Sequence, residues 1–119
     1  MKKNVYFIVA LLLTGCSATP LNHNALRVRI TNSEPGKECK YLGDVTGSQG
    51  NFMTGGFTSN ANLETGARND IKNKAASLGG NVVAILTQRA GETGTVYGGS
   101  GSVQQTNVTL TGNVYSCPN

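Results

Sequence analysis

Residues 62–87, NLETGARNDIKNKAASLGGNVVAILT, combine a helix pattern with a strand pattern and decide the fold. The first part places apolar side chains within a narrow arc at about 100° per residue, which predicts an amphipathic helix over 62–78. The residues of this arc are Leu63, Ala67, Ile71, Ala75 and Leu78. Asn62 or Thr65 can cap the start, and the pair Gly79–Gly80 can end the helix in the left-handed conformation that glycine allows.

After the glycines, residues 81–87 are almost continuously apolar, which is typical of a central strand covered on both sides. Apolar and polar residues alternate in 26–31 and in 108–115, and each alternation predicts a strand with one buried face. Residues 39–46 are interpreted as a further strand. The turn signal Glu34–Gly36 lies between strands 26–31 and 39–46, so we expect these two strands to pair antiparallel.

The chain is therefore predicted to be an α+β protein. We expect a small antiparallel or mixed sheet of about four strands with one helix packed on it, because a helix and a sheet that are each apolar on one side bury those sides against one another.

Two glycine-rich segments, 47–61 and 88–102, are predicted to be loops. The first carries Phe52, Met53 and Phe57, although polar loops rarely contain large apolar side chains. These three residues either fold over the core as a lid or form an exposed apolar contact for a partner, and local disorder is the remaining alternative. They are the candidate partner-contact residues of this sequence.

The beginning of the chain has the features of a secretory signal. A positively charged start, Met1–Lys3, is followed by an uncharged apolar stretch over 5–13. A membrane-spanning helix needs about 20 apolar residues, and this stretch is roughly half that length. The next residues, LTGC at 13–16, resemble the lipobox that the lipoprotein signal peptidase cleaves. The alternative is an ordinary buried cysteine near a hydrophobic helix.

The lipobox resemblance implies a signal peptide over 1–15 that is cleaved between Gly15 and Cys16. It also implies a diacylglycerol on the Cys16 sulfur and an acyl group on the freed amine, and such lipid anchors a small domain stably. Residues 16–25 would be the lipidated cysteine and a flexible tether. Residues 26–119 would form a single α+β domain.

The two remaining cysteines, Cys39 and Cys117, are predicted to form a disulfide, since an even pair in an exported chain is most simply bonded. Closing a loop of this length stabilises by roughly 4 kcal/mol in the chain-entropy model. A free redox-active pair or a metal site are the alternatives. The redox spacing Cys-x-x-Cys is absent, and the single histidine, His23, lies in the expected tether.

The composition contains no pattern of catalysis or nucleic-acid binding. Removal of the signal peptide leaves eight Lys and Arg against six Asp and Glu, so the net charge of +4 falls to about +2. The carboxylates lie in polar sequence, no phosphate-binding loop precedes a helix, and no basic and aromatic platform is present. We expect no enzyme, no metal, no cofactor besides the covalent lipid, no nucleic acid and no small-molecule substrate.

Several segments together resemble a known family, namely Val28–Ile30, Pro35–Cys39, Leu42–Gly43, Ala67–Ala76, Leu78–Val83 and Gly112–Asn119. The chain resembles the YjeI-like family of small Gram-negative outer-membrane lipoproteins of unknown function over nearly the whole mature domain. The surroundings of Cys39 and Cys117 are the most specific parts, whereas the two glycine-rich segments match poorly. The helix followed by LGGNVV is more distantly similar to the sensor lipoprotein of the Rcs envelope-stress phosphorelay.

These resemblances imply an address and a class of function. Ser17 after the lipidated cysteine is, by likeness to other bacterial lipoproteins, a signal for the outer membrane, and we expect the domain to face the periplasm. The leading hypothesis is a non-enzymatic binding or interaction module, held to the membrane by lipid, with an envelope protein as partner. An envelope-stress sensor or regulator of the Rcs type is the alternative. A structural protein that contacts peptidoglycan is a third class.

Overall fold

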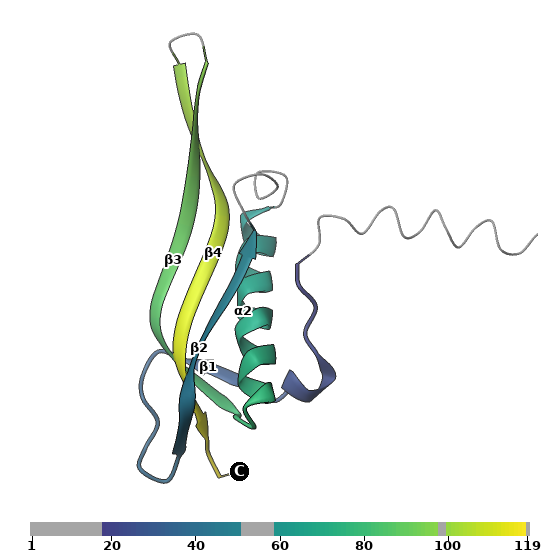
Figure 1. Cartoon of the computed structure of the whole chain (residues 1–119), viewed down its shortest axis with the longest axis vertical. Helices are drawn as coiled ribbons and strands as arrows, with labels where there is room; N and C mark the ends of the chain where they lie inside the picture. The colour runs from purple at the N-terminus through teal and green to yellow at the C-terminus, as the bar shows by residue number, and fades with distance from the viewer. Residues whose placement is uncertain (1–17, 51–58, 98–99, 119) are drawn as a thin grey trace, which may run out of the picture.

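The computed structural model describes residues 18–50, 59–97 and 100–118, with the backbone alone for 93–97 and 100–104. The elements are η1 (His23–Ala25), β1 (Arg29–Thr31), β2 (Lys40–Gly50), α2 (Asn60–Ser77), β3 (Val82–Tyr97) and β4 (Ser100–Ser116). In this described part, the strands form one four-stranded sheet in the order β1-β3-β4-β2, and α2 covers one of its faces (Figure 1). The predicted α+β class, the mixed sheet and the disulfide are confirmed.

Helix α2 begins two residues earlier than predicted, because Ser59 is the N-cap and its Oγ accepts a hydrogen bond from the Asn62 backbone at 3.1 Å. The helix ends at Ser77. Gly79 then adopts a φ of +83°, and its N–H donates to the Ala76 carbonyl at 2.9 Å. Leu78, predicted to belong to the apolar arc, lies beyond the last helical residue and is 46% exposed.

The core lies between α2 and the face of the sheet that the helix covers. Leu63, Ala67, Ile71 and Ala75 of the helix are fully buried, as their spacing predicted. They belong to one cluster with the inward-facing residues of the two central strands, which are Val83, Val108, Leu110 and Val114. Along β4, buried side chains alternate with partly exposed ones, so the opposite face of the sheet is partly open to solvent, although Val82 and Ala84 on that face are buried.

The pairing expected for strands 26–31 and 39–46 is wrong. Strand β1 comprises only Arg29–Thr31 and pairs in parallel with β3, whereas β2 pairs antiparallel with β4 at the other edge of the sheet. The long β3–β4 hairpin occupies the centre because its inward residues are apolar. The turn at Glu34–Gly36 therefore belongs to a connection that crosses from one edge of the sheet to the other, rather than to a tight hairpin.

The prediction of a loop over 88–102 is also wrong. Residues 88–97 extend β3 and residues 100–102 belong to β4, whereas 98–99 lie outside the described residues (Figure 1). The register pairs Gln88 with Leu110 at one end of this extension and Tyr97 with Ser100 at the other. The glycines in this segment suggested flexibility, but an antiparallel ladder needs only backbone donors and acceptors. Similarly, residues 47–50 of the other predicted loop belong to β2, and 59–61 cap and begin α2.

The apolar run 81–87 is covered on both faces only in its first half. Val82, Val83 and Ala84 are buried, but Leu86 is 55% exposed. The register shifts between Ile85 and Thr87, so Leu86 is the extra residue of a β-bulge and has no cross-strand partner in the ladder.

Candidate binding surface

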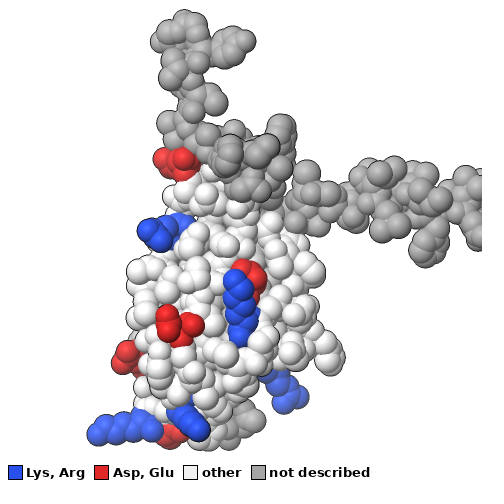
Figure 2. All heavy atoms as spheres, viewed as in Figure 1, with Lys and Arg blue, Asp and Glu red and all other residues white. Residues whose placement is uncertain are grey.

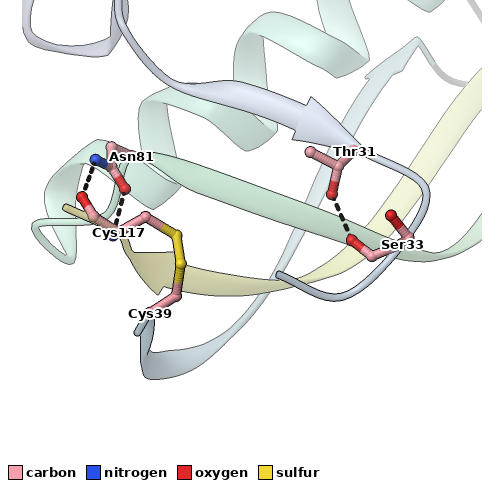
Figure 3. Close-up of a disulfide and its surroundings, with 5 residues drawn as sticks. All are labelled: Thr31, Ser33, Cys39, Asn81 and Cys117. Atoms are coloured by element: carbon pink, nitrogen blue, oxygen red, sulfur yellow. Dashed lines mark hydrogen bonds between the residues drawn. A yellow bond between two sulfur atoms is a disulfide. The ribbon is translucent and has the colours of Figure 1, made fainter. Parts of the chain in front are cut away.

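One end of the sheet is closed by the predicted disulfide. Cys39 precedes β2 and Cys117 follows β4, and their bond joins residues 78 positions apart (Figure 3). Asn81, immediately before β3, lies beside this bond. Its side-chain amide donates to the Cys117 carbonyl and accepts from the Cys117 N–H, both at 2.8 Å. The disulfide and the amide together tie the ends of β2, β3 and β4 into one unit, which is a structural role.

Replacing Asn81 by Ala should lower the free energy of unfolding by about 2 kcal/mol, because two backbone groups of Cys117 lose their partner at roughly 1 kcal/mol each. Asn81→Asp should be at least as damaging, since a carboxylate oxygen would then face the Cys117 carbonyl that now accepts from the amide. Urea titration followed by circular dichroism measures both. The exposed Asn32 supplies the matched control, and Asn32→Ala should change the value by less than about 0.5 kcal/mol.

The expected tether is not free over its whole length. Residues 19–25, called here the N-terminal segment, lie along α2. The Thr19 N–H and hydroxyl both donate to Gln49 Oε1, and Asn69 Nδ2 donates to the Thr19 carbonyl at 2.8 Å. Further along, Asn73 accepts from the Asn22 N–H at 2.8 Å and donates to the Pro20 carbonyl at 3.0 Å.

The prediction of a tether over 16–25 is therefore wrong from Thr19 onward. Asparagine normally destabilises a helix, because its side-chain amide competes for the hydrogen bonds of the backbone. Here the amides of Asn69 and Asn73 bind the backbone of the N-terminal segment instead. Ala25, at the end of the segment, is fully buried in the core. Cys16 and Gly15, the predicted lipidation and cleavage residues, lie outside the described residues.

A glycine inside the helix makes this docking feasible. Gly66 costs α2 about 1 kcal/mol relative to alanine in helix propensity. A Cβ at this position would lie 2.3 Å from Gln49 Oε1 and 2.6 Å from Gln49 Cγ. The missing side chain thus leaves the space in which Gln49 reaches Thr19.

The face of the sheet opposite α2 is the main exposed surface that the fold organises. The strand register places Thr46, Thr111 and Thr87 side by side in one row across β2, β4 and β3. It places Ser48, Thr109 and Arg89 in a second row of the same kind. Toward the disulfide, the same face carries Asp44 with Asn113 and Tyr41 with Tyr115. We call these ten residues the open face.

The open face presents mainly neutral hydrogen-bonding groups with an aromatic end, and it also carries one carboxylate, Asp44, and one guanidinium, Arg89. The hydroxyls of Thr46 and Thr111 lie 3.2 Å apart, and the rings of Tyr41 and Tyr115 meet edge to face with centroids 5.7 Å apart. Tyr41 is 53% exposed. Figure 2 shows charged side chains of both signs scattered singly or in pairs over the side of the molecule that it presents. Hydroxyl, amide and tyrosine groups on a rigid sheet suit recognition of a polar partner.

Sequence reasoning did not find this surface. The signal was the regular placement of Thr109, Thr111 and Asn113 at alternate positions of one strand, which was interpreted only as the wet side of that strand. The candidate contact residues that sequence reasoning did select, Phe52, Met53 and Phe57, lie outside the described residues.

Two further observations concern the described part of the chain. No helix there is long and apolar enough to cross a membrane. Nor do His, Cys, Asp and Glu side chains gather there in groups of three or more that could hold a metal ion.

Comparison with known proteins gives one family. The family model described as a domain of unknown function, DUF4156, matches residues 19–117. The uncharacterized protein YjeI of Escherichia coli strain K12 is 37% identical over 111 residues, which cover 92% of this chain and 90% of that protein. YjeI from E. coli O6:H1 and from Shigella flexneri match with the same identity and coverage. No solved structure matches. The family match begins at Thr19, which is the first of the described residues with a hydrogen bond to the body of the domain. Because the family model covers residues 19–117 and YjeI is 37% identical over most of both chains, this chain belongs to the DUF4156 family.

Proposed function

We propose that this protein is a non-enzymatic binding module, anchored by lipid on Cys16 to the outer membrane and facing the periplasm. The proposal of an anchor is supported by the signal-like start and by the lipobox-like LTGC at 13–16. The proposal of a binding role is supported chiefly by the open face, because it is rigid, exposed and rich in hydrogen-bonding groups.

The rigidity of the open face has identifiable causes. The disulfide closes one end of the sheet, and β4 is paired on both sides between Asn107 and Tyr115. Lys74 Nζ donates to the Thr46 carbonyl at 2.7 Å, and the Ser48 N–H donates to Asp70 at 2.9 Å. Two backbone groups at the outer edge of β2 are thereby hydrogen-bonded to side chains of the helix. A surface that is ordered before binding loses little conformational entropy when a partner arrives.

The partner we propose is an envelope protein, and photo-crosslinking in cells tests it. A photoreactive phenylalanine analogue at Thr46 or Thr87, both exposed on the open face, should give a discrete crosslinked band that mass spectrometry can identify. The same analogue at Asn24, exposed on the helix side of the domain, is the control and should give none. Adding Tyr41→Ala should weaken the band about tenfold, as removal of an aromatic anchor does.

The result that contradicts the proposal is equally specific. Bands from Asn24 alone, or no band at any position in a protein shown to be folded and membrane-bound, would exclude the open face as a protein-binding surface. Co-sedimentation of the purified protein with peptidoglycan sacculi would instead favour the structural class. A change in Rcs-reporter output on deletion would favour the sensor alternative.

The anchor has its own test. Cys16→Ala should move the protein from the membrane fraction to the soluble fraction, and intact mass should show the loss of the diacylglycerol. If the wild-type protein carries no lipid on Cys16, the proposed anchoring is wrong whatever the open face binds.

A further inference from the structure

We infer that the N-terminal segment orients the domain on the membrane, with the helix side held against a phospholipid bilayer and the open face directed away from it. The inference rests on the proposed lipid anchor at Cys16. It adds what the anchor alone does not determine, namely which surface a partner in the periplasm meets.

The first step is the length of chain between lipid and domain. Thr19 is held by Gln49 and Asn69 through its N–H, hydroxyl and carbonyl groups. Only Ser17 and Ala18 separate it from Cys16. Three backbone steps at about 3.5 Å each allow at most about 10 Å between the lipid-bearing residue and Thr19. Thr19 must therefore remain close to the bilayer surface.

The second step is the order of layers. Asn69 and Asn73 hold the N-terminal segment. They lie on the side of α2 that faces away from the buried residues Leu63, Ala67 and Ile71. The layers thus follow one another as N-terminal segment, helix and sheet (Figure 1). At its start the segment also reaches the sheet: the Thr19 N–H donates to the Gln49 side chain of β2 at 2.9 Å, so Thr19 lies within about 8 Å of that strand, on its helix side. Because the chain joins the domain on the helix side and the linker is short, a lipid on Cys16 favours contact of this side, rather than of the open face, with the bilayer.

The third step is the chemistry of the helix surface beside the docking residues. Arg68 is exposed and Lys72 is half-buried, and both lie beside Asn69, on the same side of it around α2. Among the described residues, neither cation has an ion-pair partner, and Glu64 is the acidic residue on the same side of the helix. Two cations next to the exit of the lipid-bearing chain suit the phosphate groups of phospholipids.

A distance measurement from the bilayer surface tests this orientation. The lipidated protein, reconstituted in vesicles of phosphatidylethanolamine and phosphatidylglycerol with a Ni²⁺-chelating lipid, carries one nitroxide at Arg68 or at Thr87. The nitroxide is attached through a ketone-bearing amino acid, so the disulfide is untouched. We expect strong Ni²⁺-dependent relaxation at position 68 and relaxation at position 87 no greater than in vesicles without Ni²⁺.

Two variants connect the orientation to its cause. A flexible insertion of about twelve Gly and Ser residues between Ser17 and Ala18 reaches about 20 Å and leaves the domain unchanged. It should abolish the difference between the two positions. Asn69→Ala with Asn73→Ala should do the same by releasing the N-terminal segment, and Asn32→Ala, the matched control, should preserve the difference.

The outcomes separate the inference from the proposed anchor. Protein that fails to float with vesicles, or carries no lipid, overturns the anchor and the inference together. Protein that floats but gives equal relaxation at both positions without the insertion overturns the orientation alone. Stronger relaxation at Thr87 than at Arg68 would place the open face on the membrane and overturn the orientation directly. If the asparagine variant unfolds, the insertion variant still decides the outcome, because it alters no contact within the domain.

Discussion

Replacing both Cys39 and Cys117 by serine should lower the free energy of unfolding by about 4 kcal/mol, a large share of the 5–15 kcal/mol typical of small domains. The bond joins residues 78 positions apart, so its loss restores much conformational freedom to the unfolded chain. In the folded state, it joins the start of edge strand β2 to the end of central strand β4. Urea unfolding of the soluble domain beginning at Ala18, with and without reductant, measures this value.

Three comparisons check the explanation. Reduction of the wild-type domain and the double serine substitution should give the same loss, and reductant should not affect the serine variant. Single substitution of either cysteine should be no less damaging than the pair, because it leaves a free thiol beside Asn81. A loss below about 1 kcal/mol would mean that the loop closure contributes little, and that the Asn81 hydrogen bonds suffice to hold this end of the sheet.

Gly47→Ala should be the second strongly destabilising change, at about 3 kcal/mol. Gly47 is buried in β2 where α2 crosses it. A Cβ there would lie 2.5 Å from both the Cβ and the backbone nitrogen of Ile71, and 2.7 Å from the Ala67 carbonyl oxygen. Two of these three atoms are helix backbone, which no change of side-chain rotamer can move. The helix must shift from the sheet, and the packing of Ile71 is lost.

Ser48→Ala is the control for Gly47, since Ser48 is the next residue on the same strand and its side chain is exposed. It should change the free energy of unfolding by less than about 0.5 kcal/mol. The two variants are compared by thermal and urea denaturation of the same soluble domain. A Gly47→Ala protein as stable as wild type would show that α2 does not approach β2 closely enough to exclude a methyl group.

The arrangement of the N-terminal segment bears on how such a protein works. A domain on a long tether samples many orientations, and its partner must find the correct one. Here, five hydrogen bonds from Thr19, Pro20 and Asn22 to side chains of Gln49, Asn69 and Asn73 hold the segment to the body. Under the proposed anchoring, the open face is presented to the periplasm in one orientation, which favours partners that approach the membrane from that side.

Some features of the fold could be derived from sequence because they depend on neighbours along the chain. The arc from Leu63 to Ala75 predicted the buried side of α2, and Gly79 predicted its end, since helix periodicity and glycine conformation are local properties. The alternation over 108–115 predicted the two faces of β4. The pairing of Cys39 with Cys117 followed because, apart from Cys16, which was predicted to carry lipid, the chain contains two cysteines.

Other features depend on residues far apart in sequence. The hairpin beyond Gln88 was predicted to be a loop because its glycines are locally flexible, and only its pairing partner makes it a strand. The N-terminal segment was predicted to be a tether because nothing in residues 19–25 shows that asparagines about 50 positions later will accept it. Strand order was mispredicted for the same reason, since a turn signal does not specify which strands become neighbours.

The sequence by itself therefore determined the helix, its buried side, the class of fold and the cysteine pair, because each follows from local periodicity, glycine conformation or residue count. Only the tertiary structure decided the strand order, the extent of the β3–β4 hairpin, the docking of Thr19 and the opposition of the open face to the N-terminal segment. These depend on hydrogen bonds and packing between distant segments, whose free energies exist only when the chain has brought those segments together.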